Sequence, residues 1–190
     1  MAGGLASPPG TDGLWTFVFM DMVIFLLMFV TFMGERQAHV ALYALSQLHL
    51  NELFGLANTL ILLSSSWMMA EAVQASRRMA SEHVSRYLAA AFLLGLAFVV
   101  TKAVEYALKF SAGITPATNS FYSFYFFITI VHFLHVLVGM ACMAYCRAHA
   151  RTGVGTSQYQ LGLENVGLFW HFVDVLWIFI FPMLYLLGRQ

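Results

Sequence analysis

The chain has 190 residues, of which 61% are hydrophobic and 9% are charged, and its nine basic residues balance its nine acidic ones. Soluble domains carry about 25% charged residues, so this composition excludes an ordinary soluble enzyme. A formal net charge of zero also gives no electrostatic surface for nucleic acid, and no nucleic-acid partner is expected.

Five apolar runs follow one another along the chain, and each is long enough to cross a bilayer as a helix. A hydrocarbon core about 30 Å thick requires about 20 helical residues. The connections between the runs are too short to hold an independent catalytic module. After an N-terminal tail at residues 1–13, the sequence predicts one all-α domain over residues 14–190, an integral membrane bundle of five transmembrane helices at residues 14–33, 52–73, 86–108, 120–146 and 163–187.

Basic residues near the span ends predict the orientation, because short cytoplasmic loops keep an excess of Lys and Arg. Arg36, Lys109 and Arg189 fall on the side opposite the N-terminus. More basic residues fall on the side of the N-terminus, which we therefore expect to be cytoplasmic. These are Arg77, Arg78, Arg86, Arg147 and Arg151.

Polar side chains interrupt the spans, and each ionisable one costs roughly 2.5–3.5 kcal/mol on insertion unless it has an interior partner. A rise of about 1.5 Å per residue sorts them into two layers. In the outer layer lie Asn58, Lys102 and Glu105, and the i,i+3 spacing predicts that Lys102 and Glu105 neutralise each other. Thr129 is a softer polar group, and Glu164 lies where the last span begins. The inner layer comprises Asp21, Ser65, His132, His135, His171 and Asp174.

Several interpretations fit the inner layer. His132 and His135 share one helix face, as do His171 and Asp174, and this spacing suits metal or haem ligands held between two helices. Interhelical hydrogen bonds, worth about 0.6–2 kcal/mol each, explain the same residues without a ligand. Binding of lipid headgroups and proton handling are further interpretations. The residues alone do not select among them.

Asp21 stands apart, because it interrupts an apolar span with no cation within one helical turn. A carboxyl group at such a position favours its neutral form. Asp21 is therefore expected either to donate a hydrogen bond to a neighbouring helix or to serve a proton-linked role.

Aromatic residues and one proline add two structural expectations. Trp67, Trp170 and Trp177 lie deep in their spans and are expected to pack against other helices. Pro182 interrupts the last span, where the missing backbone N–H predicts a local bend.

The last two spans carry the most specific sequence patterns of the chain. One is WHFVDVLW at residues 170–177, and the other is FYFFITIVHFLHVLVG at residues 124–139, which includes Thr129, His132 and His135. Both resemble subunit III of the haem-copper oxidases. Three further segments agree in order, so the resemblance covers residues 15–188; they are ANTLILLSSS at 57–66, LGLAFVVTKAVEY at 94–106 and the first span with its acid at Asp21.

Departures from the family pattern narrow the resemblance. Ile130 and Phe133 stand where two glycines are usual, which argues against a close helix approach at those points. Mitochondrial-type members have seven helices, two of which precede the span with the acid. Five spans, Asp21 in place of Glu and Lys102 in place of Gln together look most like the branch associated with bacterial nitric oxide reductase.

The resemblance implies a non-catalytic subunit of the bacterial inner membrane, with a cytoplasmic N-terminus and a periplasmic C-terminus. It would pack beside the catalytic subunit of a haem-copper oxidase or a nitric oxide reductase and among membrane lipids. Haem and copper, or non-haem iron, would belong to those partner subunits, whereas this chain would carry no metal and at most bound phospholipid.

The resemblance also implies a role, which is to support the assembly, stability or proton uptake of nitric oxide reductase. One alternative is subunit III of a bacterial cytochrome c oxidase that supports oxygen reduction, and another is a small proton or solute conductor. Asp21 would be the buried acid with a proton-linked role. The polar bundle and its lipid contacts would involve Asn58, Ser65, Lys102, Glu105, Thr129, His132, His135, Glu164, Trp170, His171 and Asp174.

Overall fold

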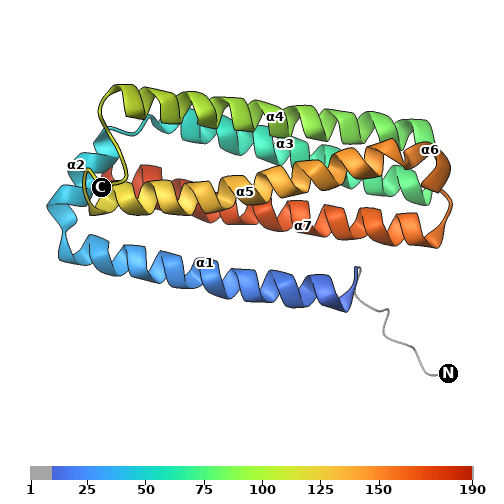
Figure 1. Cartoon of the computed structure of the whole chain (residues 1–190), viewed down its shortest axis with the longest axis horizontal. Helices are drawn as coiled ribbons and strands as arrows, with labels where there is room; N and C mark the ends of the chain where they lie inside the picture. The colour runs from blue at the N-terminus through green and yellow to red at the C-terminus, as the bar shows by residue number, and fades with distance from the viewer. Residues whose placement is uncertain (1–9, 190) are drawn as a thin grey trace.

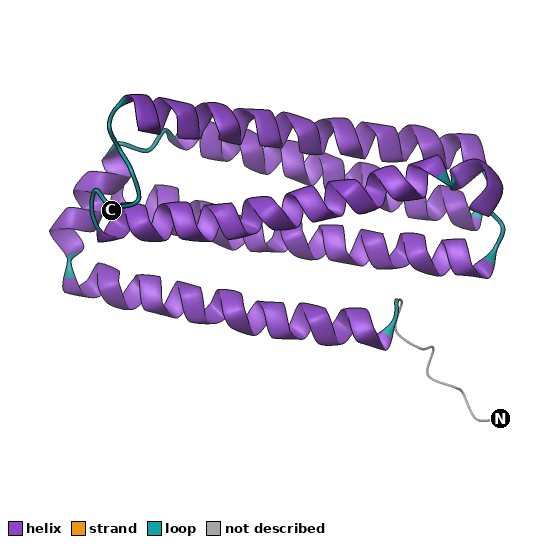
Figure 2. Ribbon diagram, in the orientation of Figure 1, coloured by secondary structure: helices purple, strands orange, loops and turns teal. Residues whose placement is uncertain are grey.

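The computed structural model describes residues 10–189, and every regular element in that range is helical (Figure 2). Five helices are long and apolar enough to cross a membrane. The last of them joins α7 to a π-helical turn. Residues 1–9 of the predicted tail lie outside the described residues. The long helices are α1 (Asp12–Ala38), α3 (Glu52–Arg77), α4 (Ser81–Ser111), α5 (Ser120–Ala148) and α7 (Ser157–Phe181).

Side-chain caps set several of the helix starts. Thr11 and Asn119 precede α1 and α5, and each accepts a hydrogen bond from a backbone N–H three residues later. Such caps satisfy backbone donors that have no partner within the helix. The helices also extend into polar sequence beyond the predicted apolar runs, and α4, which has no side-chain cap, begins at Ser81 rather than at residue 86.

Two short helices occupy segments that were predicted as connections. They are α2 (Val40–Leu48) and α6 (Ala150–Gly153). Tyr43 and Gln47 of α2 are fully buried, so α2 closes one end of the bundle rather than crossing it. A search for runs of about 20 apolar residues misses such an element because it is too short to span a membrane.

The long helices lie side by side, with the two short ones at opposite ends of the bundle (Figure 1). α3 packs against α4 and α7, and α5 also packs against α4 and α7. α1 forms one edge, where it meets α5 and α7 (Figure 1). Its outer face is apolar and exposed, as expected for a surface that faces lipid.

The expected bend at Pro182 takes the form of a change in helix type. α7 ends at Phe181, a π-helix follows at Pro182–Leu186, and a 3₁₀ turn ends the described chain. Two side chains from the start of the chain bind carbonyl groups of this irregular segment. Gln47 Nε2 donates to the carbonyls of Met183 and Leu184, at 3.0 and 3.1 Å, and Arg36 Nη2 donates to that of Leu187 at 2.8 Å.

Two helices approach closely around Trp170, which is fully buried as predicted. A Cβ atom on Gly139 would lie 2.6 Å from its ring, and one on Gly95 would lie 3.2 Å from it. Ile130 is 42% exposed, so the helix faces at that position do not meet. The close approach occurs at Gly139, the glycine that this chain retains in the FYFFITIVHFLHVLVG pattern of residues 124–139.

The expectation for the deep tryptophans is correct for Trp177 and wrong for Trp67. Trp177 is buried, and its Nε1 donates to Thr59 at 3.0 Å. Trp67 is 66% exposed and lies on the face of α3 that no other helix covers. Depth along a span does not determine on which side of the helix a residue lies.

Candidate functional site

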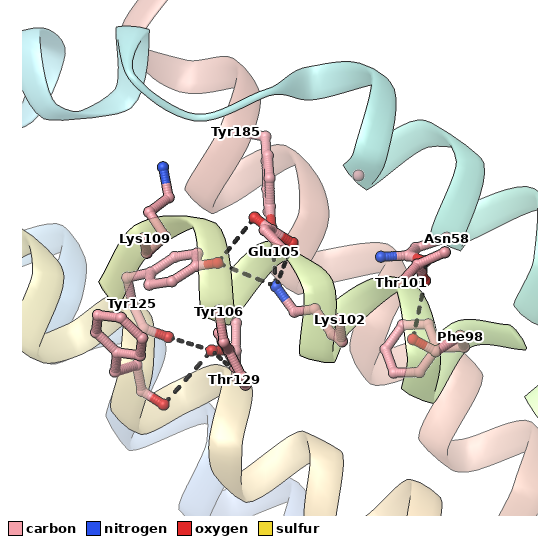
Figure 3. Close-up of polar contacts among 12 residues, drawn as sticks. Asn58, Phe98, Thr101, Lys102, Glu105, Tyr106, Lys109, Tyr125, Thr129 and Tyr185 are labelled. Carbon is pink, nitrogen blue, oxygen red and sulfur yellow. Dashed lines mark hydrogen bonds and ion pairs between the residues drawn. The ribbon is translucent and has the colours of Figure 1, made fainter. Parts of the chain in front are cut away.

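The most elaborate polar cluster of the structure surrounds Lys102 of α4 (Figure 3). This side chain is fully buried, and its Nζ lies 3.0 Å from Glu105 Oε2. It also donates to the hydroxyl groups of Tyr185 at 2.9 Å and Tyr125 at 3.2 Å. The predicted pairing of Lys102 with Glu105 is therefore confirmed, within a larger group.

The two tyrosines also bind the carboxylate, which makes the cluster self-contained. Tyr125 donates to Glu105 Oε1 at 2.8 Å and Tyr185 donates to the same oxygen at 2.6 Å. Charge-assisted bonds of this kind are about twice as strong as neutral ones. Because Tyr125 lies on α5 and Tyr185 follows α7, the cluster joins three parts of the bundle.

Lys109 extends the cluster towards the α2 end of the molecule (Figure 3). It is buried, and its Nζ donates to the carbonyl of His49 at 2.8 Å. Its bond fixes the loop between α2 and α3 to the end of α4. Sequence reasoning did not select Lys109, because it stands at the end of the predicted span.

Asn58 and Thr129 take part in interhelical hydrogen bonds, as their positions within spans suggested. Asn58 of α3 accepts a hydrogen bond from Thr101 of α4. Thr129 of α5 accepts from Tyr106 of α4 at 2.8 Å. Both bonds lie beside the Lys102 cluster (Figure 3), so they add to the same polar layer.

Asp21 has no cation within one turn of its own helix, but a neighbouring helix supplies a partner. Its Oδ2 lies 3.2 Å from His135 Nε2, and this contact is an ion pair when the histidine is protonated. Asp21 is buried, whereas His135 is partly exposed and packs edge-on against Phe25. The partner comes from α5, so the sequence around Asp21 could not reveal it.

The predicted inner layer does not form one polar group. His132 is fully buried, with its ring centroid 5.8 Å from that of Phe98 and 5.3 Å from that of Trp177. Neither of its nitrogens has a hydrogen-bond partner among residues 10–189. His135 instead turns towards α1. The i,i+3 spacing of the two histidines therefore does not produce a joint site.

The remaining inner-layer residues follow the interface of α3 with its neighbours. His171 Nδ1 is hydrogen-bonded to Ser66 Oγ at 2.5 Å, and Ser65 donates to the carbonyl of Ala91 at 2.9 Å. Asp174 is buried, and its carboxyl oxygens form no hydrogen bond within the described part of the chain. Interhelical hydrogen bonding thus accounts for Ser65, Ser66 and His171.

Glu164 lies at the surface end of the bundle rather than in its interior. Its Oε1 is 3.0 Å from Arg77 Nη2, and this pair joins α7 to the end of α3. Along residues 10–189, no group of three His, Cys, Asp or Glu side chains is arranged to hold a metal ion. The hydrogen bonds and ion pairs of Ser65, Thr129, Glu164 and His171 each join two helices.

Comparison with known proteins gives a consistent result over nearly the whole chain. The family model described as cytochrome c oxidase subunit III matches residues 10–189. A protein named cytochrome bo(3) ubiquinol oxidase subunit 3, from Pseudomonas aeruginosa, is 31% identical over 177 residues, which are 93% of this chain and 84% of that protein. Probable quinol oxidase subunit 3 of Staphylococcus aureus is 32% identical over 181 residues, covering 93% of this chain and 88% of the relative.

Proposed function

Because the chain belongs to the cytochrome c oxidase subunit III family, we propose that it is a non-catalytic subunit of a bacterial respiratory haem-copper oxidase. The observation that carries this proposal is the family match over residues 10–189. The self-contained Lys102 cluster is consistent with it, since its charges are bound by the protein's own side chains. Haem and copper would lie in the partner subunits.

Oxygen reduction is the better-supported activity of the partner complex, with a quinol or cytochrome c as electron donor. The relatives compared above are named as quinol oxidase subunits, and neither is named as part of a nitric oxide reductase. Alignments covering 84% and 88% of these relatives mean that they are only slightly longer than this chain. A short chain is therefore not particular to the nitric oxide branch.

The proposed membrane arrangement has five crossings and a cytoplasmic N-terminus. Arginines support it, because Arg78, Arg86, Arg147 and Arg151 lie near the bundle end where α1 begins, and short cytoplasmic loops are rich in such residues. A C-terminal fusion to alkaline phosphatase tests it. The phosphatase fusion should be active, because the C-terminus is proposed to be periplasmic. An inactive phosphatase fusion, together with fluorescence from a separate C-terminal fusion to a protein that fluoresces in the cytoplasm, would contradict the arrangement.

Affinity purification from native membranes in mild detergent tests the identity of the partner. Visible spectra and mass spectrometry of the eluate should reveal a haem-copper oxidase core. Recovery of a nitric oxide reductase core would overturn the oxidase proposal. If the chain is instead purified alone and colourless, and conducts protons in proteoliposomes, the alternative of a small proton or solute conductor would be favoured.

The proposed contribution to the complex is stability and sustained proton uptake, with Asp21 as the proton-linked residue. Its burial and its contact with His135 support this role. Asp21→Asn should lower the turnover of the purified complex, measured as quinol-driven oxygen uptake, while the complex stays intact on gel filtration. Asp12→Asn changes an acid in the first turn of the same helix and is the matched control. Equal turnover of the two variants would reduce Asp21 to a structural role.

A further inference from the structure

A groove between α4 and α5 lies well away from Lys102 and Asp21, and we propose that it binds an anionic phospholipid whose phosphate is held by Arg147 and Arg151. This inference does not depend on which gas the partner complex reduces. It rests on the shape of the groove, on the charge at its rim and on its apolar wall.

The groove has a volume of about 670 Å³, within the range of about 300–1,000 Å³ that is typical of ligand pockets. α4 contributes one wall, including Ser85, Phe92 and Leu93, and α5 contributes Ala144 and Arg147. Alanines on both helices leave the space between them open. The groove therefore results from small side chains at a helix–helix junction.

Two arginines at its rim lack partners of their own. The side chains of Arg147 and Arg151 form no ion pair or hydrogen bond with another described residue, whereas Arg77 pairs with Glu164 and Arg86 pairs with Glu82. No acidic side chain lines the groove. A guanidinium group offers a planar set of donors that matches a phosphate group, so these two side chains suit that ligand.

The depth of the groove distinguishes a lipid from a free phosphate. Arg147 lies in the last turn of α5 and Arg151 lies in α6, at the end of the bundle where α4 begins (Figure 1). From Ser85 to Leu93 the wall extends along about 12 Å of helix axis. Phe92 and Leu93 thus offer apolar contacts to an acyl chain below the phosphate. Basic pockets between transmembrane helices bind anionic lipid headgroups in this way.

Lipid retention by the full chain, purified with the subunits that accompany it, tests the proposal. The protein is placed in nanodiscs of phosphatidylglycerol and phosphatidylcholine, and its retained lipids are counted by native mass spectrometry. Phosphatidylglycerol should be retained in preference. Arg147→Gln and Arg151→Gln should each lower its occupancy about fivefold.

Two controls separate a specific site from general attraction to a basic surface. Arg78→Gln removes the same charge near the same end of the bundle but outside the groove, and it should leave occupancy unchanged. Ala144→Phe keeps both arginines but fills the groove, and it should abolish retention. Gel filtration and thermal unfolding show whether each variant is folded.

Four results of the experiments with variants would overturn the proposal, and a fifth comes from added phosphate. They are unchanged occupancy in folded arginine variants, an equal loss in Arg78→Gln, unchanged retention in Ala144→Phe, and release of a protein subunit rather than lipid. Addition of inorganic phosphate is the final arm. If millimolar phosphate displaces the lipid completely, the site recognises phosphate alone and the lipid assignment fails.

Discussion

Glu105→Gln should destabilise the protein strongly, because it leaves the Lys102 ammonium buried without its counter-charge. At the observed Nζ–Oε2 distance of 3.0 Å, the Coulomb attraction is about 5–6 kcal/mol for an effective dielectric constant of about 20. Removing one partner of a buried pair typically costs about 3–5 kcal/mol. We expect a loss of that size in the free energy of unfolding.

Reversible unfolding in mixed micelles of dodecyl maltoside and dodecyl sulfate, followed by circular dichroism, measures this loss. The control is Glu82→Gln, which breaks the ion pair with Arg86 between side chains that are 75% and 71% exposed and should cost about 0.3–0.5 kcal/mol. Combining Glu105→Gln with Lys102→Met should restore part of the stability. The reasoning is refuted if Glu105→Gln costs less than about 1 kcal/mol or if the double variant is less stable than the single one.

Three further changes test other contacts by the same unfolding measurement. Gly139→Ala should cost about 1–3 kcal/mol, because its Cβ would lie 2.6 Å from the indole ring of Trp170. In the control Gly34→Ala the added Cβ meets no atom within 4 Å, so this change should be neutral or stabilising. Equal effects of the two changes would contradict the packing argument. Gln47→Leu removes two hydrogen bonds to the end of the last helix and should cost about 1–3 kcal/mol and speed amide exchange there, and unchanged exchange would count against it. His135→Leu should cost about 1–3 kcal/mol by leaving Asp21 without its partner, and Asp21→Asn in the same chain should recover part of this loss. No recovery in the double variant would contradict the argument.

Local spacing was sufficient to predict part of the candidate site. Lys102 and Glu105 lie three residues apart on one helix, so their pairing follows from helix geometry alone. The hydroxyl partners were not predictable in this way. Tyr185 stands near the end of the last span, where tyrosine ordinarily faces the membrane interface, and only the packing of that span against α3 and α5 turns it inward.

Depth along the membrane was the weaker guide. Residues at one depth were expected to meet, yet His132 and His135 point to different neighbours because a helix distributes its side chains around its axis. Asp21 and its partner His135 lie about 114 positions apart in the sequence, so no local spacing rule connects them. Hydropathy predicted the five apolar helices, but it carries no information about which faces meet.

The contacts at the irregular end of the last helix also bear on the order in which the membrane domain is completed. Arg36 and Gln47 enter the membrane region early during synthesis, while the carbonyl groups that they bind follow Pro182 and emerge last. Until then the amide of Gln47 lacks its two acceptors. A chain that ends before Pro182 would therefore leave the side chains of Arg36 and Gln47 without these acceptors, so the α2 end of the bundle is completed only when the last residues arrive.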